Sequence, residues 1–422
     1  MAERVLIINT EWPEESCPVQ AATLVNYQIL LELVSRPSVE VGFLKVCSEK
    51  AQASLNDVQS HAKELLESSG VTFLDPVTLP APPGLRPRLS RLLFPRLVDF
   101  YPITADKKAA YAAAQVFDPT SIIIQWCENE SHLYSDFPAK KFAYYGNSDI
   151  FIEKEWGKYL SKFGESLRSR IIRLLQMKRL EKFHLREMKK WNFFSCVSLN
   201  FAKYYQRKFG DKAFYLNNIW VDRYGEDWQE KRDALETAEK IKIVGSIGFL
   251  RASANTMGLE ILARDLLPEL RKTLPKDSFS LDIYGSGQPL AHVKKLLDQP
   301  EIIVHGFVED LDAEIFRSQI FLCVNNASPY KTGHTRYLHA WSLGCCVVAH
   351  RDVALSMPEL KHNHNALLGE NMADIAKLIA KAASDPELRR RLGENGYKTL
   401  AREFRVEHVV DTMLEKLTSI EL

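Results

Sequence analysis

Residues 327–350 read ASPYKTGHTRYLHAWSLGCCVVAH, and this stretch decides the fold. Turn-forming residues extend to Gly333, and the residues from Thr335 to Leu343 carry a helical pattern. Gly344 stands where the C-terminus of a helix favours a left-handed residue, and the apolar run at 345–349 follows it. The pattern therefore predicts a loop, a helix and a buried strand, in that order.

The same stretch has the features of an anion site. A helix that opens from a glycine loop presents amide donors without partners. Arg336 falls in the first turn of this helix, where a guanidinium can hold a phosphate with two hydrogen bonds. His339 follows three residues later on the same face. Taken alone, the stretch is more typical of an ordinary helix–strand unit with solvated polar residues.

The composition is that of a globular chain with large cores. Its 422 residues allow two domains of about 200 residues each. The hydrophobic share is 46%, and the net charge of +1 argues against a nucleic-acid-binding surface over the whole protein. Seven scattered cysteines without a CxxC pair, and no apolar run of membrane-spanning length, indicate a cytoplasmic protein with reduced thiols.

Short apolar runs alternate with helical patterns along the whole chain. In the first half, strands and helices are expected at 5–8, 21–34, 39–46, 55–68, 71–74, 109–116, 121–126, 141–145, 154–190, 194–199 and 213–216. In the second half, they are expected at 241–247, 257–273, 281–284, 290–297, 302–304, 312–317, 320–324, 335–343, 345–349, 366–368, 372–383, 386–404 and 406–417. Such alternation predicts α/β architecture, with helices on both faces of parallel sheets.

Two doubly wound, Rossmann-like parallel-sheet domains account for this alternation. A polar, charged stretch with few branched apolar residues separates them. We predict a first domain at 1–222, a linker at 223–240, a second domain at 241–404, and a last helix at 405–422 that is free to pack back on the first domain. Domains of this kind bind a ligand in the cleft between the carboxyl ends of their sheets.

The order of pieces in the second half resembles the GT-B glycosyltransferases of the family-4 type, also called glycosyltransferase group 1. The matching pieces are GSIGFLRASANTMGLEIL (245–262), LDIYGSG (281–287), VHGFVEDL (304–311), the opening stretch, and LGENGYKTLAREF (392–404). The first half matches in the order of its elements and in WNFFSCVSLNFAKYYQRKFG (191–210) followed by YLNNIWVD (215–222). The resemblance covers most of the chain, whereas each short motif alone is weak.

The resemblance implies a glycosyltransferase that moves a sugar, such as a hexose, from a nucleotide-sugar donor to a hydroxyl acceptor. The acceptor would be a glycan or a lipid-linked molecule, as in polysaccharide biosynthesis. Relatives retain the configuration of the sugar and usually work without a metal, so no cofactor is expected. In such a reaction the leaving phosphate oxygen itself can take the acceptor proton, and preorganised cations meet the developing charge.

The resemblance also implies the donor site. Its positions in this sequence are Gly245, Ser246, Gly248, Gly285, Gly287, Phe307, Val308, Gly333, His334, Thr335, Arg336 and His339. Arg336 supplies the cation of the last block, and Arg251 is the candidate for the second one, because Ser246 stands where relatives carry arginine. His339 stands where relatives carry the glutamate that binds the ribose hydroxyls, and an imidazole cannot match the two oxygens of a carboxylate. Gly285 and Gly287 are at least as typical of tight turns as of ligand contacts.

Acceptor groups are expected where the strands of the first domain end. Glu128 and His132 follow one buried strand, and Asp149 follows another. We therefore name His132 and Asp149, with Glu128, as candidates for catalysis or acceptor binding. Each of them, taken individually, is more often an ordinary loop residue.

Two basic segments with interleaved apolar residues, 85–97 and 154–190, bear on partners. A basic amphipathic surface can dock on an anionic membrane, here at its inner face, or bind an anionic acceptor. A solvated helix face is the simpler interpretation of 154–190. No nucleic-acid-binding module is present, so we expect no nucleic-acid partner.

Two other functions compete with the transferase. The departures at Ser246 and His339 favour a non-catalytic GT-B-like protein that binds a nucleotide, a glycan or a partner protein. A sugar-nucleotide epimerase would need clear acidic groups near the donor, and none stands out in the second half.

Overall fold

The computed structural model describes residues 3–15, 21–48, 56–79, 104–128, 130–146, 148–163, 166–222, 224–235, 240–325 and 334–420. The chain divides into two compact units, which are described separately below. The first unit comprises Met1–Val197, Phe201–Leu216 and Val406–Leu422, and the second comprises Ser198–Asn200 and Asn217–Arg405.

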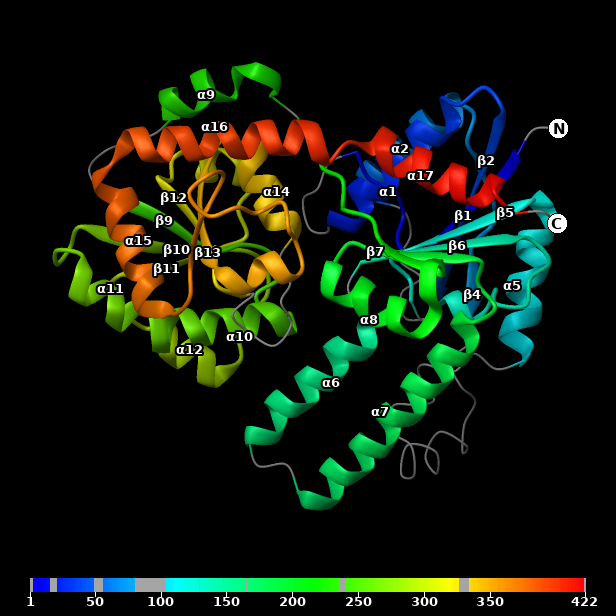
Figure 1. The fold of residues 1–422 in the computed structure, drawn as a ribbon, viewed down its shortest axis with the longest axis horizontal. Coiled ribbons are helices and arrows are strands. Elements are labelled where there is room, and N and C mark those ends of the chain that lie inside the picture. The colour runs from blue at the N-terminus through cyan, green and yellow to red at the C-terminus, as the bar shows by residue number, and fades with distance from the viewer. Residues whose placement is uncertain are drawn as a thin grey trace. The chain divides into compact units, whose positions relative to one another are not determined.

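A parallel sheet with the order β3-β2-β1-β5-β6-β7-β8 forms the middle of the first unit, and β4 also pairs with β2 (Figure 1). Its strands are β1 (Glu3–Asn9), β2 (Val39–Ser48), β3 (Thr72–Phe73), β4 (Val77–Leu79), β5 (Ser121–Gln125), β6 (Lys140–Tyr145), β7 (Phe193–Cys196) and β8 (Ala213–Tyr215). Val5–Asn9 in β1 and all of β5 are buried, because helices cover both faces of the sheet and no alternate residue meets water.

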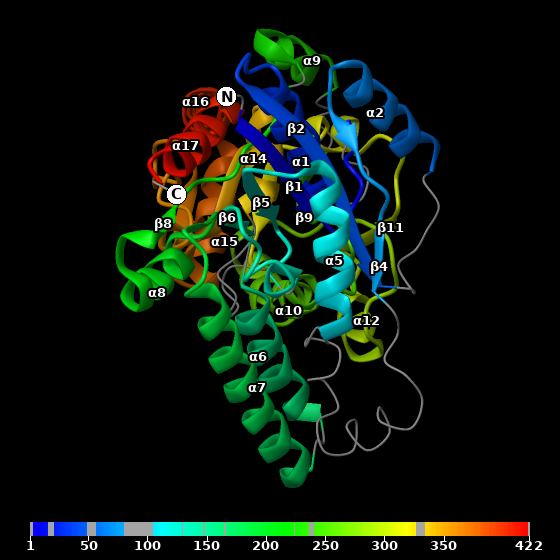
Figure 2. The ribbon, with the colours of Figure 1, turned by 90° about the vertical axis from the view of Figure 1, so that its right-hand side faces the viewer.

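The helices of the first unit come from the first half of the chain and from its C-terminal end. They are α1 (Ala21–Val34), α2 (Asp57–Ser68), α5 (Thr104–Phe117), α6 (Asp149–Leu160), α7 (Leu167–Met188), α8 (Leu199–Phe209) and the last helix, α17 (Val406–Thr418). The Asp411 carboxylate of α17 lies 2.9 Å from the Arg36 guanidinium, and the Lys416 ammonium lies 5.2 Å from the centre of the Phe193 ring. Figure 2 shows α17 with α1 and the strands of this unit.

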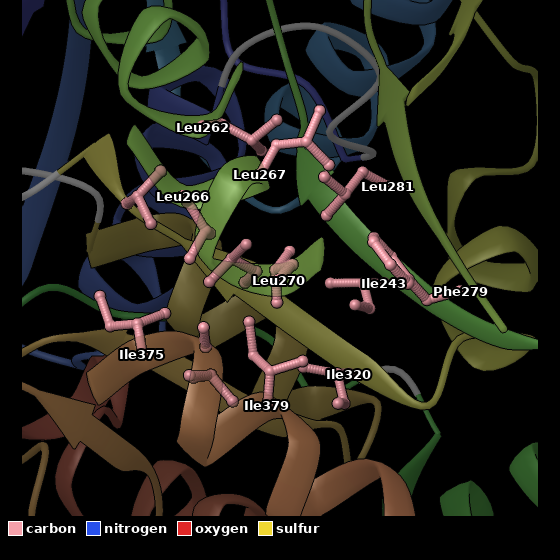
Figure 3. Close-up of a cluster of buried hydrophobic side chains, with 14 of the residues drawn as sticks. Ile243, Leu262, Leu266, Leu267, Leu270, Phe279, Leu281, Ile320, Ile375 and Ile379 are labelled. Atoms are coloured by element: carbon pink, nitrogen blue, oxygen red, sulfur yellow. The ribbon is translucent and has the colours of Figure 1, made fainter. Parts of the chain in front are cut away.

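The second unit contains a six-stranded parallel sheet with the order β11-β10-β9-β12-β13-β14. Its strands are β9 (Ile241–Ser246), β10 (Phe279–Tyr284), β11 (Ile302–Gly306), β12 (Ile320–Cys323), β13 (Cys346–His350) and β14 (Leu367–Gly369). Its helices are α9 (Trp228–Leu235), α10 (Ser253–Ile261), α11 (Leu267–Thr273), α12 (Ala291–Leu297), α13 (Leu311–Phe316), α14 (His334–Ser342), α15 (Met372–Ser384) and α16 (Pro386–Glu403). Figure 3 shows one face of its core, where Leu266 and Leu270 approach Ile243 and Ile379. Both units therefore confirm the predicted α/β class.

The segment predicted as a linker is part of the second unit, so that prediction is wrong. Trp228 of α9 is buried, and its ring lies against Gly344, where an added Cβ would be 1.9 Å from the nearest ring carbon. The Arg232 guanidinium, also buried, donates to the Ser318 carbonyl at 2.5 Å and to the Cys345 sulfur at 3.1 Å. Only one face of this short helix is apolar, and its average composition therefore looked like that of a linker.

The helical region predicted over 154–190 is two helices in the structure. Helix α6 ends at Leu160, a 3₁₀ turn covers Ser161–Phe163, and α7 begins at Leu167 with Ser166 as its N-cap. Within the described chain, no helix is both long and apolar enough to cross a membrane.

Candidate functional site

The carboxyl edge of the second sheet is the place where the sequence motifs converge. The chain forms β9, β10 and β11 in one direction and then returns to add β12 on the other side of β9. Crevices at such a reversal of strand order are the usual ligand sites of doubly wound sheets. Here the loop after β9 leads into α10, and β12 is followed, through residues outside the described chain, by α14.

Asn255, in the first turn of α10, makes hydrogen bonds to three segments at this edge of the sheet. Its side-chain amide donates to the Phe249 carbonyl at 2.7 Å and to the Ile247 carbonyl at 3.4 Å. Its side-chain oxygen accepts from the Asn325 amide at 2.8 Å and from the Arg336 guanidinium. Asn255 thereby ties the loop after β9, the end of β12 and the first turn of α14 together, and it is only 1% exposed.

Arg336 is held over the glycine loop by this contact. An added Cβ on Gly248, whose φ is +97°, would lie 4.0 Å from a terminal nitrogen of Arg336. The guanidinium is partly exposed, so it can reach a ligand while one of its nitrogens donates to Asn255. A positive charge next to backbone that lacks a side chain is suited to a phosphate group.

The loops after β9 and β10 pass so closely that only glycine fits between them. Gly285 has a φ of +146°, and an added Cβ would lie 1.7 Å from the Gly248 carbonyl oxygen. The Leu250 amide donates to the Ser286 carbonyl at 2.9 Å across the same crossing. Gly287, with a φ of +82°, lies beneath the ring of Phe249. For Gly285 and Gly287, the structure shows the close-turn role that the sequence had left open.

Two hydroxyl groups near this edge are buried without a hydrogen-bond partner among the described residues. They are Oγ of Ser246, at the end of β9, and Oγ1 of Thr256, next to Asn255. Buried hydroxyl groups are normally hydrogen-bonded, and the oxygen of a ligand would satisfy them. Ser246 lacks the charge of arginine, and its contact with a ligand stays a prediction.

His339 is paired with a carboxylate of the neighbouring helix. Its Nε2 donates to Oδ1 of Asp312, in α13, over 2.6 Å, and Oδ2 of Asp312 accepts from the Tyr224 hydroxyl at 3.1 Å. The Trp220 ring lies 5.5 Å from the imidazole, centre to centre. Position 339 therefore carries no carboxylate of its own, but the carboxylate of Asp312 lies directly beside the imidazole.

The remaining donor-site candidates differ in how far they are exposed. Arg251 is exposed in the loop before α10, and Thr335 is partly buried at the start of α14. Phe307 is exposed after β11, whereas Val308 packs against the core below. Gly333 and the side chain of His334 lie outside the described part of the chain.

The candidates of the first unit form a buried network instead of a strand-end surface. Oε1 of Glu128 accepts from the Tyr205 hydroxyl at 2.6 Å and from the Ser148 hydroxyl at 3.1 Å, and it lies 3.0 Å from Nε2 of His184. Nδ1 of His184 in turn lies 3.0 Å from Nε2 of His132. Glu128 and His132 are 2% and 1% exposed, so neither meets a substrate in this arrangement.

This burial differs from the prediction for a physical reason. After Glu128 the chain folds into a 3₁₀ turn, Glu130–His132, that packs against α7. Burial, together with the neighbouring His184, lowers the pKa of His132 to about 3. For Asp149, the structure describes only the start of α6 and not the side chain.

Asn255 and Asn325 are site residues that the sequence motifs missed. Asn325 follows the end of β12, and Asn255 lies in the first turn of the helix after β9. These positions are the only signal that could have marked them. Among the described residues, no group of three or more His, Cys, Asp or Glu side chains is arranged to hold a metal ion. Independence from metals stays a prediction.

Comparisons with known proteins agree with this architecture. Residues 241–385 match the family model described as glycosyl transferases group 1. Anabaena Alr3699/HepE, crystallised with UDP and glucose, is 14% identical and aligns over 99% of both chains with a TM-score of 0.63. Sucrose-phosphate synthase from Thermosynechococcus elongatus (13% identity, 99% of this chain and 98% of that chain, TM-score 0.63) and TarM (9% identity, 99% of both chains, TM-score 0.66) are also similar. No curated protein sequence matches the chain.

The family-model match and these structures confirm the resemblance to GT-B glycosyltransferases and the predicted fold class. At such identities the structures show the fold alone, and the family-4 assignment stays a prediction.

Proposed function

We propose that this chain, whose residues 241–385 match the glycosyl transferases group 1 model, transfers a hexose from a nucleotide-sugar donor to a hydroxyl acceptor. The observation that carries the proposal is the position of Arg336. Asn255 fixes it over Gly248, at the reversal of strand order in the sheet that the family model covers. Retention of configuration and independence from metals are part of the proposal.

The proposed chemistry is charge stabilisation. When the sugar leaves, negative charge develops on the nucleoside diphosphate, and Arg336 meets it with charged hydrogen bonds. Arg251, exposed in the neighbouring loop, is the proposed second cation. Amide groups at Gly245–Gly248, with the unpaired hydroxyl of Ser246, are proposed to contact the phosphates.

UDP is the proposed nucleotide of the donor. The support is that HepE was crystallised with UDP, and that a TarM variant was crystallised with UDP and alpha-GlcNAc-glycerol. The ribose contact is assigned to His339. Because Nε2 donates to Asp312, the other ring nitrogen, Nδ1, is the atom proposed to contact one ribose hydroxyl. The acceptor is proposed to be a glycan or a lipid-linked molecule.

A non-catalytic binding protein is the second candidate, and the replacement of a carboxylate by the His339–Asp312 pair favours it. Incubation with a panel of UDP- and GDP-sugars separates the two functions. A transferase is stabilised against heat by its donor and slowly releases the nucleoside diphosphate to water. Stabilisation without release in the presence of glycan and lipid acceptors would support the binding protein. Absence of both responses would overturn the transferase and a nucleotide-binding protein alike.

A further inference from the structure

Helices α6 and α7 form a hairpin that extends away from the sheet of the first unit. Figures 1 and 2 show the two helices side by side in both views. The C-terminal half of α7 packs into the unit, where Leu180, His184 and Met188 are buried. Its N-terminal half does not, and every residue from Leu167 to Ile171 is exposed.

Four large apolar side chains of this half face solvent. Leu167 is 73% exposed, Ile171 53%, Leu174 59% and Leu175 53%. Their spacing of four, seven and eight residues places them on one side of the helix, here called the apolar stripe. Leu180 follows Leu167 at a spacing that turns it to roughly the opposite side. The apolar stripe therefore faces away from the unit that α7 belongs to.

Cations border the apolar stripe. Helix α7 contains seven lysine and arginine residues against two glutamates, and no acidic residue precedes Glu181. Arg168 and Lys178 are exposed, and Lys182 continues the same side of the helix. At the tip of the hairpin, Phe163 is 50% exposed and its ring packs on Tyr159. An anionic bilayer has negatively charged headgroups above apolar acyl chains. The cations and apolar side chains at the end of this hairpin match these two layers.

We propose that the apolar stripe of α7 docks this protein on the anionic headgroup surface of a lipid bilayer. Leu167, Ile171 and Leu174 enter the boundary between headgroups and acyl chains, while Arg168, Lys178 and Lys182 meet lipid phosphates. A second copy of the chain fits less well, because pairing two α7 stripes would oppose two rows of lysine and arginine side chains. Nucleic acid would leave the leucines without a role, since aliphatic side chains do not stack on bases.

This inference goes beyond the proposed transfer reaction, because it concerns a partner and not a substrate. It sharpens the membrane contact expected for 154–190; the other basic segment, 85–97, lies outside the described residues. The first test is co-flotation of the full chain with vesicles made of equal parts phosphatidylcholine and phosphatidylglycerol, compared with phosphatidylcholine alone.

Two variants and two matched controls decide the outcome. Leu167→Gln with Ile171→Gln and Leu174→Gln removes the apolar stripe, and Arg168→Gln with Lys178→Gln and Lys182→Gln removes the charge. Val116→Gln with Leu355→Gln, at exposed apolar sites elsewhere, and Lys294→Gln with Lys295→Gln are the controls. All changes are on exposed side chains, so thermal unfolding should match that of the wild type. We expect each α7 variant to lower partition onto anionic vesicles by about tenfold or more, and the controls to leave it unchanged.

Several results would overturn the proposal. One is equal partition of the wild type onto both kinds of vesicle, or onto neither. Another is a dimer in sedimentation analysis that only the apolar-stripe variant dissociates, which would assign the surface to a second copy. Tight, salt-sensitive binding of duplex DNA that the charge variant loses and the apolar-stripe variant keeps would assign it to nucleic acid. Thermal stabilisation by nucleotide sugars is independent of all these results, so failure here leaves the transferase proposal intact.

Discussion

Nε2 of His339 donates a hydrogen bond to Oδ1 of Asp312 over 2.6 Å, and this pair joins α14 to α13. The side chains are 14% and 12% exposed. An acidic residue at position 339 would accordingly meet another carboxylate at close range. The residue at position 339, which the resemblance led us to expect as a departure from the family pattern, is therefore coupled to a second residue.

Replacement of His339 by glutamate tests this coupling. We expect His339→Glu to lower the free energy of unfolding by about 2 kcal/mol, because two carboxylates repel each other in a partly buried place. His339→Gln should stay close to the wild type, since its amide still donates to Asp312. The double variant Asp312→Asn with His339→Glu should recover most of the loss. Urea unfolding gives all three values, and a free energy of unfolding for His339→Glu equal to that of the wild type would contradict the coupling.

The crossing of the two glycine loops gives a second prediction. Gly285→Ala should destabilise the second unit by about 3 kcal/mol or more, because the new Cβ meets the Gly248 carbonyl and the backbone conformation disfavours a side chain. Gly306→Ala is the matched control: its φ is +76°, but an added Cβ meets nothing within 4 Å. Gly306→Ala should lower the free energy of unfolding by only about 1–2 kcal/mol. Equal losses in thermal unfolding would mean that the loops do not cross as described.

Burial of His132 predicts a dependence of stability on pH. Its pKa is lowered from the usual 6.5 to about 3. Between these two pH values, His132 is therefore protonated in the unfolded chain but not in the folded chain. Stability is therefore lost as pH falls from 6.5 towards 3, by about 1.4 kcal/mol per pH unit at most. His132→Gln keeps a hydrogen-bond donor for His184 but cannot be protonated. It should therefore remove the contribution of His132 to the slope of unfolding free energy against pH. Urea unfolding between about pH 6.5 and pH 5 measures it, and identical slopes would place His132 outside the core.

The secondary structure and the fold were largely predictable because both sheets are buried on both faces. Continuous apolar runs such as the strand after Gly344 identify strands, and glycine or proline marks where helices end. Arg336 was also predictable, since its place in the first turn of a helix is a local property. Helix α9 was not, because the burial of Trp228 depends on a helix surface formed far away in sequence.

The other features of the site depend on which elements become neighbours. Asn255 and Asn325 meet only because β12 is added beside β9, and no pattern within either segment encodes that contact. The His339–Asp312 pair likewise requires α13 and α14 to lie together. His132 follows a buried strand as predicted, but local sequence does not show that the turn which contains it folds inward.

The donor site depends on Arg336, and calorimetric titration with UDP tests it most directly. The native chain should bind UDP, and Arg336→Ala should weaken binding by about a hundredfold, because charged hydrogen bonds to the diphosphate are lost. Arg336→Lys keeps the positive charge but cannot make the paired hydrogen bonds of a guanidinium. Its affinity for UDP should be about tenfold lower than that of the native chain. Arg402→Ala, an exposed arginine of the same unit, should bind like the wild type. If Arg336→Ala bound UDP, or whichever nucleoside diphosphate the native chain releases, as tightly as the native chain does, the assignment of the donor site would be contradicted.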